Sequence, residues 1–139
     1  MKTAFRRIGI VFAVLVAARL VAALIWPTIN DVRTGGTPEY ADLQPQQFRL
    51  PRERVFAAAL EAAQALGWKV TSQDAARGEI QAVATTQVFH FKDDVTVTLG
   101  DREGAAVVDV RSHSRIGKGD LGVNARRIRA FQAELAKRL

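Results

Sequence analysis

A long apolar run near the N-terminus constrains this chain more than any other feature. Residues 8–26 are apolar except for Arg19. As an α-helix they would extend about 28 Å, close to the roughly 30 Å thickness of a bilayer's hydrocarbon core. Trp26 stands where an interfacial aromatic residue is expected, and Pro27 ends the helix. The run is therefore predicted to be a single transmembrane helix, so that the protein contacts a membrane through residues 8–26.

Basic residues before the run set its expected orientation. Positive charge on the N-terminal side keeps that side in the cytoplasm, so the chain is predicted to be a single-pass inner (cell) membrane protein with a periplasmic or other extracytoplasmic domain. Arg19 splits the run, however, and residues 8–18 also have the length of a signal-peptide core, with a small-residue cleavage site at 21–23. An uncleaved anchor and a cleaved signal peptide both stay open, and a cytoplasmic domain is a third interpretation. The basic residues concerned are Lys2, Arg6 and Arg7.

Composition excludes several classes of site. The chain has no cysteine, which excludes disulfides, a cysteine zinc site and a thiol nucleophile. Its net charge of +6 is uneven, because the first 27 residues carry four of the 20 basic groups and none of the 14 acidic ones. The rest of the chain is therefore almost neutral, and we predict no nucleic-acid partner. Residues 111–139 still hold eight basic and two acidic groups, which gives a basic C-terminal face.

Hydrophobic periodicity predicts one α+β domain over residues 47–139. Residues 1–26 would form the cytoplasmic start and the anchor, and residues 27–46, rich in Pro, Gly, Thr and Asp, would form a linker. The expected order is β-α-β-β-β-β-α, an antiparallel sheet with two helices on one face. The predicted strands cover 47–50, 68–72, 79–86, 94–99 and 105–114, and the predicted helices follow Pro51 and Asp120.

Three sequence motifs resemble a known family. They are NDV at residues 30–32, TTQVFHFKDDV at 85–95, and VDVRSHSRIG at 108–117 with its continuation DLGVNARRI at 120–128. Over most of residues 30–135 the chain resembles the bacterial family called domain of unknown function 1499 (DUF1499). The resemblance supports the domain boundary and implies a membrane-anchored or exported protein. It implies no activity.

The motifs gather polar residues that a plain core does not need, and we take these as the candidate contact region. Adjacent Asp93 and Asp94 should point to opposite faces of a strand, whereas Asp120 and Asn124 should share a helix face. The glycine-bearing loop at 115–120 leads into a helix N-terminus, where an anion can bind, but Asp120 in the same loop would repel a phosphate. The candidates are Asp93, Asp94, Arg111, Arg115, Lys118, Asp120, Asn124 and Arg127.

The same residues also have a purely structural interpretation. Asp93 or Asp94 would pair with Arg111 or Arg115, and Asp120 would cap the last helix. Inward-facing serines at 112 and 114 would bond to loop backbone. The aromatic residues at 89 and 91 are expected in the core, and the histidines at 90 and 113 at the surface. No metal and no cofactor are predicted, and no catalytic residue is identified.

Three functional hypotheses follow. The favoured one is a membrane-tethered extracytoplasmic domain that binds a protein partner or an envelope component, with residues 115–124 as the contact region. One alternative is a small hydrolase or ligand-binding enzyme that uses Asp93, Asp120 and Arg115. The other is binding of anionic lipid through the basic residues of the last helix, which are Arg126, Arg127, Arg129, Lys137 and Arg138.

Overall fold

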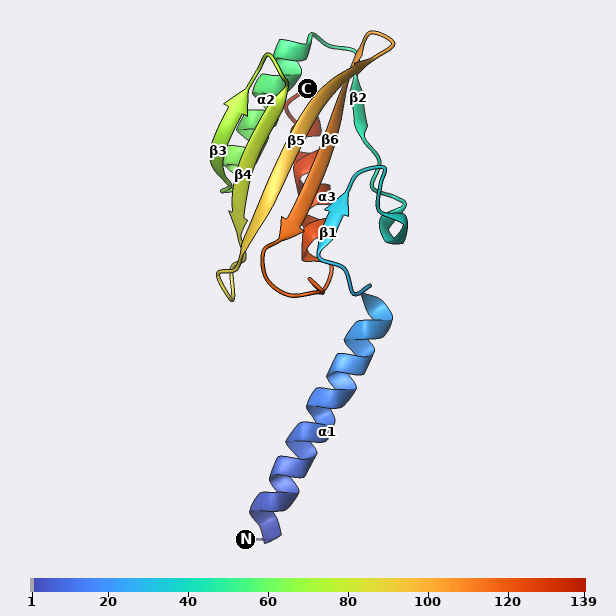
Figure 1. Ribbon diagram of the computed structural model, residues 1–139, viewed down its shortest axis with the longest axis vertical. Helices are drawn as coiled ribbons and strands as arrows, with labels where there is room; N and C mark the ends of the chain where they lie inside the picture. Colours follow the sequence, from blue (N-terminus) through green and yellow to red (C-terminus); the bar gives the residue numbers. More distant parts are fainter. Residues whose placement is uncertain (1) are drawn as a thin grey trace.

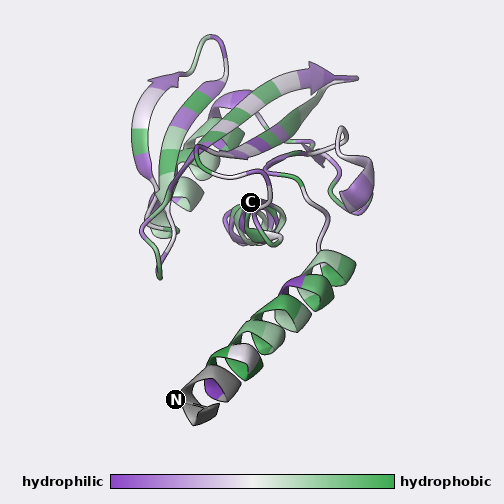
Figure 2. Ribbon diagram, turned by 60° about the horizontal axis from the view of Figure 1, so that its bottom comes forward, coloured by the Kyte–Doolittle hydropathy of each residue, from purple (hydrophilic) through white to green (hydrophobic). Residues whose placement is uncertain are grey.

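A long N-terminal helix stands apart from the folded domain. The computed structural model describes residues 2–139, and its first element is α1, Lys2–Ile25 (Figure 1). The segment Arg7–Ile25 is long and apolar enough to cross a membrane, and none of it is buried in the fold. Hydrophobic colouring runs along most of its length (Figure 2). Such a helix is compatible with a single-pass anchor or with a signal sequence.

The rest of the chain forms an antiparallel six-stranded sheet with two helices, which confirms the predicted α+β class. The strand order is β1-β6-β5-β4-β3, and β2 also pairs with β6. β1 and β2 share one edge of β6, because β1 pairs with residues 111–113 and β2 with residues 106–108. The strands are β1 Asp31–Arg33, β2 Gln46–Phe48, β3 Lys69–Asp74, β4 Glu79–Thr85, β5 Lys92–Arg102 and β6 Ala105–Ser114.

The segment expected to be a linker contributes to the fold. Residues 27–46 contain strand β1, a 3-10 helix at Pro38–Tyr40 and the first residue of β2. Val32 is completely buried. Thr34, also buried, donates from Oγ1 to the Asp109 carboxylate (3.0 Å) and accepts from the amide of Val110 (3.0 Å). A three-residue strand is too short to show a period of two, and its partner strand lies about eighty positions away.

Two helices cover one face of the sheet, α2 (Arg52–Ala65) and α3 (Val123–Ala136) (Figure 1). Gly67 terminates α2 as predicted: the helix ends at Ala65, and the positive φ of 73° at Gly67 lets the chain turn while its amide bonds to the carbonyl of Gln64 (2.9 Å). Trp68 then stacks on Phe131 of α3, with ring centroids 5.3 Å apart. Every core residue lies beyond residue 28, so residues 28–139 carry a complete core without α1.

Candidate functional site

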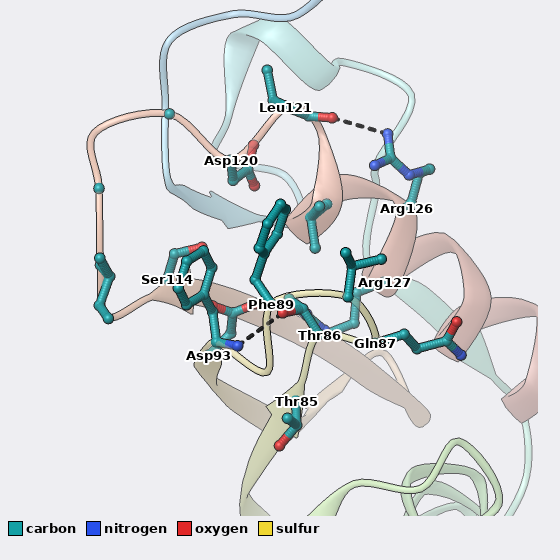
Figure 3. A pocket seen from close by; sticks show the side chains of 16 residues that line it. Thr85, Thr86, Gln87, Phe89, Asp93, Ser114, Asp120, Leu121, Arg126 and Arg127 are labelled. Carbon is teal, nitrogen blue, oxygen red and sulfur yellow. Dashed lines mark hydrogen bonds and ion pairs between the residues drawn. The ribbon is translucent and has the colours of Figure 1, made fainter.

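A pocket of about 730 Å³ lies between two loops of the domain (Figure 3). These loops are at the end of the domain from which α1 emerges (Figure 1). They are residues 86–91 between β4 and β5 and residues 115–122 between β6 and α3. The ends of β5, β6 and the first turns of α3 complete the wall. The side chains of the wall include Thr85, Phe89, Phe91, Asp93, Ser114, Ile116, Asp120, Leu121, Val123, Arg126 and Arg127.

The first loop is closed by Thr86. Its hydroxyl accepts a hydrogen bond from the amide of Phe91, and its own amide donates to the Phe91 carbonyl, both at 2.9 Å. His90 adopts a positive φ of 53°, which extended strand backbone does not have. Phe89 and Phe91 stack on each other at 5.5 Å but are exposed, so the prediction that they lie in the core is wrong. Phe89 and Phe91 alternate with polar residues as side chains of a strand do, but the turn closed by Thr86 sets the local conformation.

The second loop is tied to the residues that follow α1. The amide of Asp120 donates to the carbonyl of Ile29 (3.0 Å), and the side-chain amide of Asn30 donates to the carbonyl of Gly117. The Asp120 carboxylate accepts from the amides of Gly122 and Asn124, each at 2.8 Å. Asp120 therefore satisfies amides at the start of α3, as predicted for a cap, although the helix itself begins at Val123.

A buried polar network forms the floor of the pocket. Asp93 and Arg127 make an ion pair with a distance of 2.6 Å, and both side chains are almost completely buried. Arg127 also donates to the hydroxyl of Ser112 (2.9 Å) and to the amide oxygen of Asn124 (2.8 Å). Asn124 in turn donates to the Ser114 hydroxyl (2.8 Å). The inward position of both serines is confirmed, but Asp93 pairs with Arg127 and not with Arg111 or Arg115.

Two further ion pairs lie on the opposite face of the sheet. Arg115 pairs with Asp94 (2.6 Å), as predicted, and its hydrogen bonds hold the pKa of that carboxyl below its usual value. Arg111 pairs with Asp31 (2.5 Å), whose pKa is lowered by the same cause. Asp93 and Asp94 thus point to opposite faces, as expected from strand geometry.

The eight candidates therefore do not form one site. Asp93, Asn124 and Arg127 meet in the buried network, and Asp120 lies on the pocket wall beside it. The side chains of Asp94, Arg111 and Arg115 project from the other face, and Lys118 is exposed within the second loop. Within residues 2–139, no three His, Asp or Glu side chains are placed to hold a metal ion.

Arg126 is the charged residue of the pocket wall that the candidate set omits. It donates from Nη1 to the carbonyl of Leu121 (3.0 Å) and makes no ion pair with any described carboxylate. Arg129 of α3 is paired with Asp42, and Arg138, which follows the helix, is paired with Glu134. In the sequence, Arg126 is one of five basic residues assigned to the last helix. It differs from the others only in having no described carboxylate beside it, and the sequence does not show where the carboxylates lie.

One protein family covers most of this chain. The family described as "Protein of unknown function (DUF1499)" matches residues 21–135. No curated protein matches the chain. Among solved structures, TTHA0849 from Thermus thermophilus is similar with 13% identity and a TM-score of 0.41, covering 78% of this chain and 95% of that one. Ara h 8.0201 has 10% identity and the same TM-score, covering 78% and 96%. Likenesses this weak carry no argument about function.

Proposed function

Because this chain belongs to the DUF1499 family, whose function is unknown, we propose a function from the pocket itself: the protein is a membrane-tethered domain that binds a small amphipathic anion. The tether is α1, and the positive charge before it favours a domain on the extracytoplasmic side. In this proposal the envelope component expected from the sequence is a molecule with an apolar body and one negative group.

The distribution of exposed hydrophobic side chains carries the proposal. Within residues 27–139, every exposed large hydrophobic side chain belongs to the wall of this one pocket. Scattered exposed apolar residues are normal on soluble domains, whereas a gathered set around a concave surface is typical of a binding site. These side chains are Val88, Phe89, Phe91, Ile116 and Leu121.

The polar groups of the wall favour an anionic ligand. Asp93 is neutralised by Arg127, and the Asp120 carboxylate already accepts two backbone amides. Arg126 keeps guanidinium donors free, since only Nη1 is bonded and only to one carbonyl. A carboxylate, sulfonate or phosphate on a ligand can occupy those donors with a charge-assisted hydrogen bond.

The two alternatives have weaker support. A hydrolase using Asp93, Asp120 and Arg115 would need three groups at one place, but Arg115 pairs with Asp94 on the other face of the sheet. Asp93 would also have to leave a buried ion pair to exchange a proton. Lipid binding by the basic face of α3 is weakened because Arg127, Arg129 and Arg138 are engaged by carboxylates.

The test uses residues 28–139 and the fluorescent probe 1-anilinonaphthalene-8-sulfonate, which has an apolar ring system and one sulfonate. Native protein should bind the probe saturably at one site. Arg126→Gln removes the charged partner and should weaken binding about tenfold, because a hydrogen bond to a charged group contributes about 1.5–3 kcal/mol. Val123→Phe should weaken it as well by occupying pocket volume.

The matched control is Arg102→Gln, which removes an exposed arginine at the far end of β5. It should leave the affinity unchanged. The proposal is wrong if the probe does not saturate, or if R102Q and R126Q weaken binding equally. Circular dichroism of each variant verifies that the probe reports a native protein.

A further inference from the structure

Four large hydrophobic side chains at the mouth of the pocket are more exposed to solvent than is favourable on the surface of a soluble protein. We name them the apolar rim: Val88 (78% exposed), Phe89 (71%), Ile116 (65%) and Leu121 (51%). Two come from each loop, and none belongs to the hydrophobic core. Their exposure is therefore not explained by the folding of the domain.

The rim lies where α1 leaves the domain. The amide of Ser114 donates to the carbonyl of Asn30 (2.8 Å), and the Asp120 amide donates to that of Ile29 (3.0 Å), so the second loop is bonded to residues just after the helix. The ring of Trp26 lies so close to Gly122 that a Cβ there would come within 2.6 Å of it. Both loops project from the same end of the sheet as α1 (Figure 1).

The charges around the rim suit a lipid headgroup region. Residues 86–91 contain no acidic residue, and the second loop contains only Asp120, whose carboxylate is turned to backbone amides. Lys118 lies exposed between the two rim residues of that loop. Exposed apolar residues interleaved with an unpaired lysine are typical of segments that sit at a membrane interface.

We infer that the apolar rim is a second membrane contact, inserted into the headgroup boundary of the bilayer that α1 crosses. The occupant of this surface is the bilayer itself, because continuity with α1 places the rim at the level of the helix end. The pocket then opens onto the lipid surface. This inference concerns the rim and stands whether or not the pocket holds an anion.

The test places a fluorophore on the rim of the full-length protein in vesicles of phosphatidylcholine and phosphatidylglycerol. In a Trp26→Phe background, Phe89→Trp reports on the rim and Arg102→Trp on the far end of β5, while the parent W26F protein gives the signal of the buried Trp68. Lipids brominated near the headgroup end of the acyl chain quench a tryptophan at the interface. We expect strong quenching of F89W and none of R102W beyond the parent.

A second measurement separates the bilayer from other occupants. Residues 28–139, which carry the whole core, should co-sediment with the same vesicles, and the double variant Phe89→Ser, Leu121→Ser should lower the partition coefficient about tenfold or more. Equal quenching of F89W and R102W would overturn the inference. So would a dimer of residues 28–139 in solution that F89S with L121S converts to monomer, since a second copy would then cover the rim. Loss of probe binding in R126Q bears only on the pocket.

Discussion

Replacing Asp93 with asparagine tests how the floor of the pocket is held together. The side chain of Asp93 is 3% exposed and that of Arg127 is 9% exposed, and their ion pair distance is 2.6 Å. Asp93→Asn keeps the shape of the side chain but removes its charge. The guanidinium of Arg127 would then remain buried, with only the neutral partners Ser112 and Asn124.

The expected loss is about 3 kcal/mol, the lower end of the range for breaking one side of a buried ion pair, because asparagine can still accept one hydrogen bond. The free energy of unfolding of a natural domain is about 5–15 kcal/mol, so the variant should still fold. With a urea m-value of about 1–3 kcal/mol per molar, the unfolding midpoint should fall by about 1–3 M.

The assay is urea unfolding of residues 28–139 at neutral pH, followed by the fluorescence of Trp68, the one tryptophan left when residue 26 is removed. Arg127→Met in the D93N background should restore part of the loss, because no charge remains buried. The matched control is Asp94→Asn, which breaks a half-exposed pair and should cost much less. Equal losses for D93N and D94N, or no coupling between D93N and R127M, would refute the reasoning.

Two further predictions use the same assay. Gly67→Ala should lower the free energy of unfolding by about 1 kcal/mol, because an alanine must take a positive φ there in otherwise open space. Gly78→Ala should lower it more, because its Cβ would also lie 2.7 Å from the carbonyl oxygen of Leu99. Equal losses for the two variants would contradict this reasoning. The pKa of Asp94 is lowered in the folded state, mainly by its hydrogen bonds with Arg115. The stability that this pair contributes is therefore fully present above the ordinary carboxyl pKa of about 4, and it is lost as the pH falls through the lower pKa of the folded state. Asp94→Asn should therefore flatten the decline in stability below about pH 4, and an unchanged pH profile would argue against it.

Much of the fold could be predicted because its long elements have a clear hydrophobic period. β6 and the two helices follow uninterrupted apolar patterns, and Gly67 marks the end of α2. β1 could not be found in this way, since Val32 is its only buried residue and the strand depends on pairing with β6. A contact that remote leaves no local signal.

The sequence predicted only part of how the candidate side chains are placed. Strand parity correctly separated Asp93 from Asp94, and the motifs contained Asn124 and Arg127. The partner of Asp93, however, is decided by which helix residue lies over β5 in three dimensions. The exposure of Phe89 and Phe91 in the loop at 86–91 was not predicted, because apolar residues that alternate in a turn have the same sequence pattern as those of a buried strand.

The connection between α1 and β1 has a consequence for where the domain can act. Five residues, 26–30, separate Ile25 from Asp31, and even fully extended the six steps between these two Cα atoms would reach only about 20 Å. With α1 inserted as an anchor, as proposed above, the domain would sample a thin layer above the bilayer, and a molecule in that bilayer would meet it at a high effective concentration. Even a weak intrinsic affinity for a membrane constituent would then give substantial occupancy, whereas a target held across a wider gap would have to diffuse to the domain.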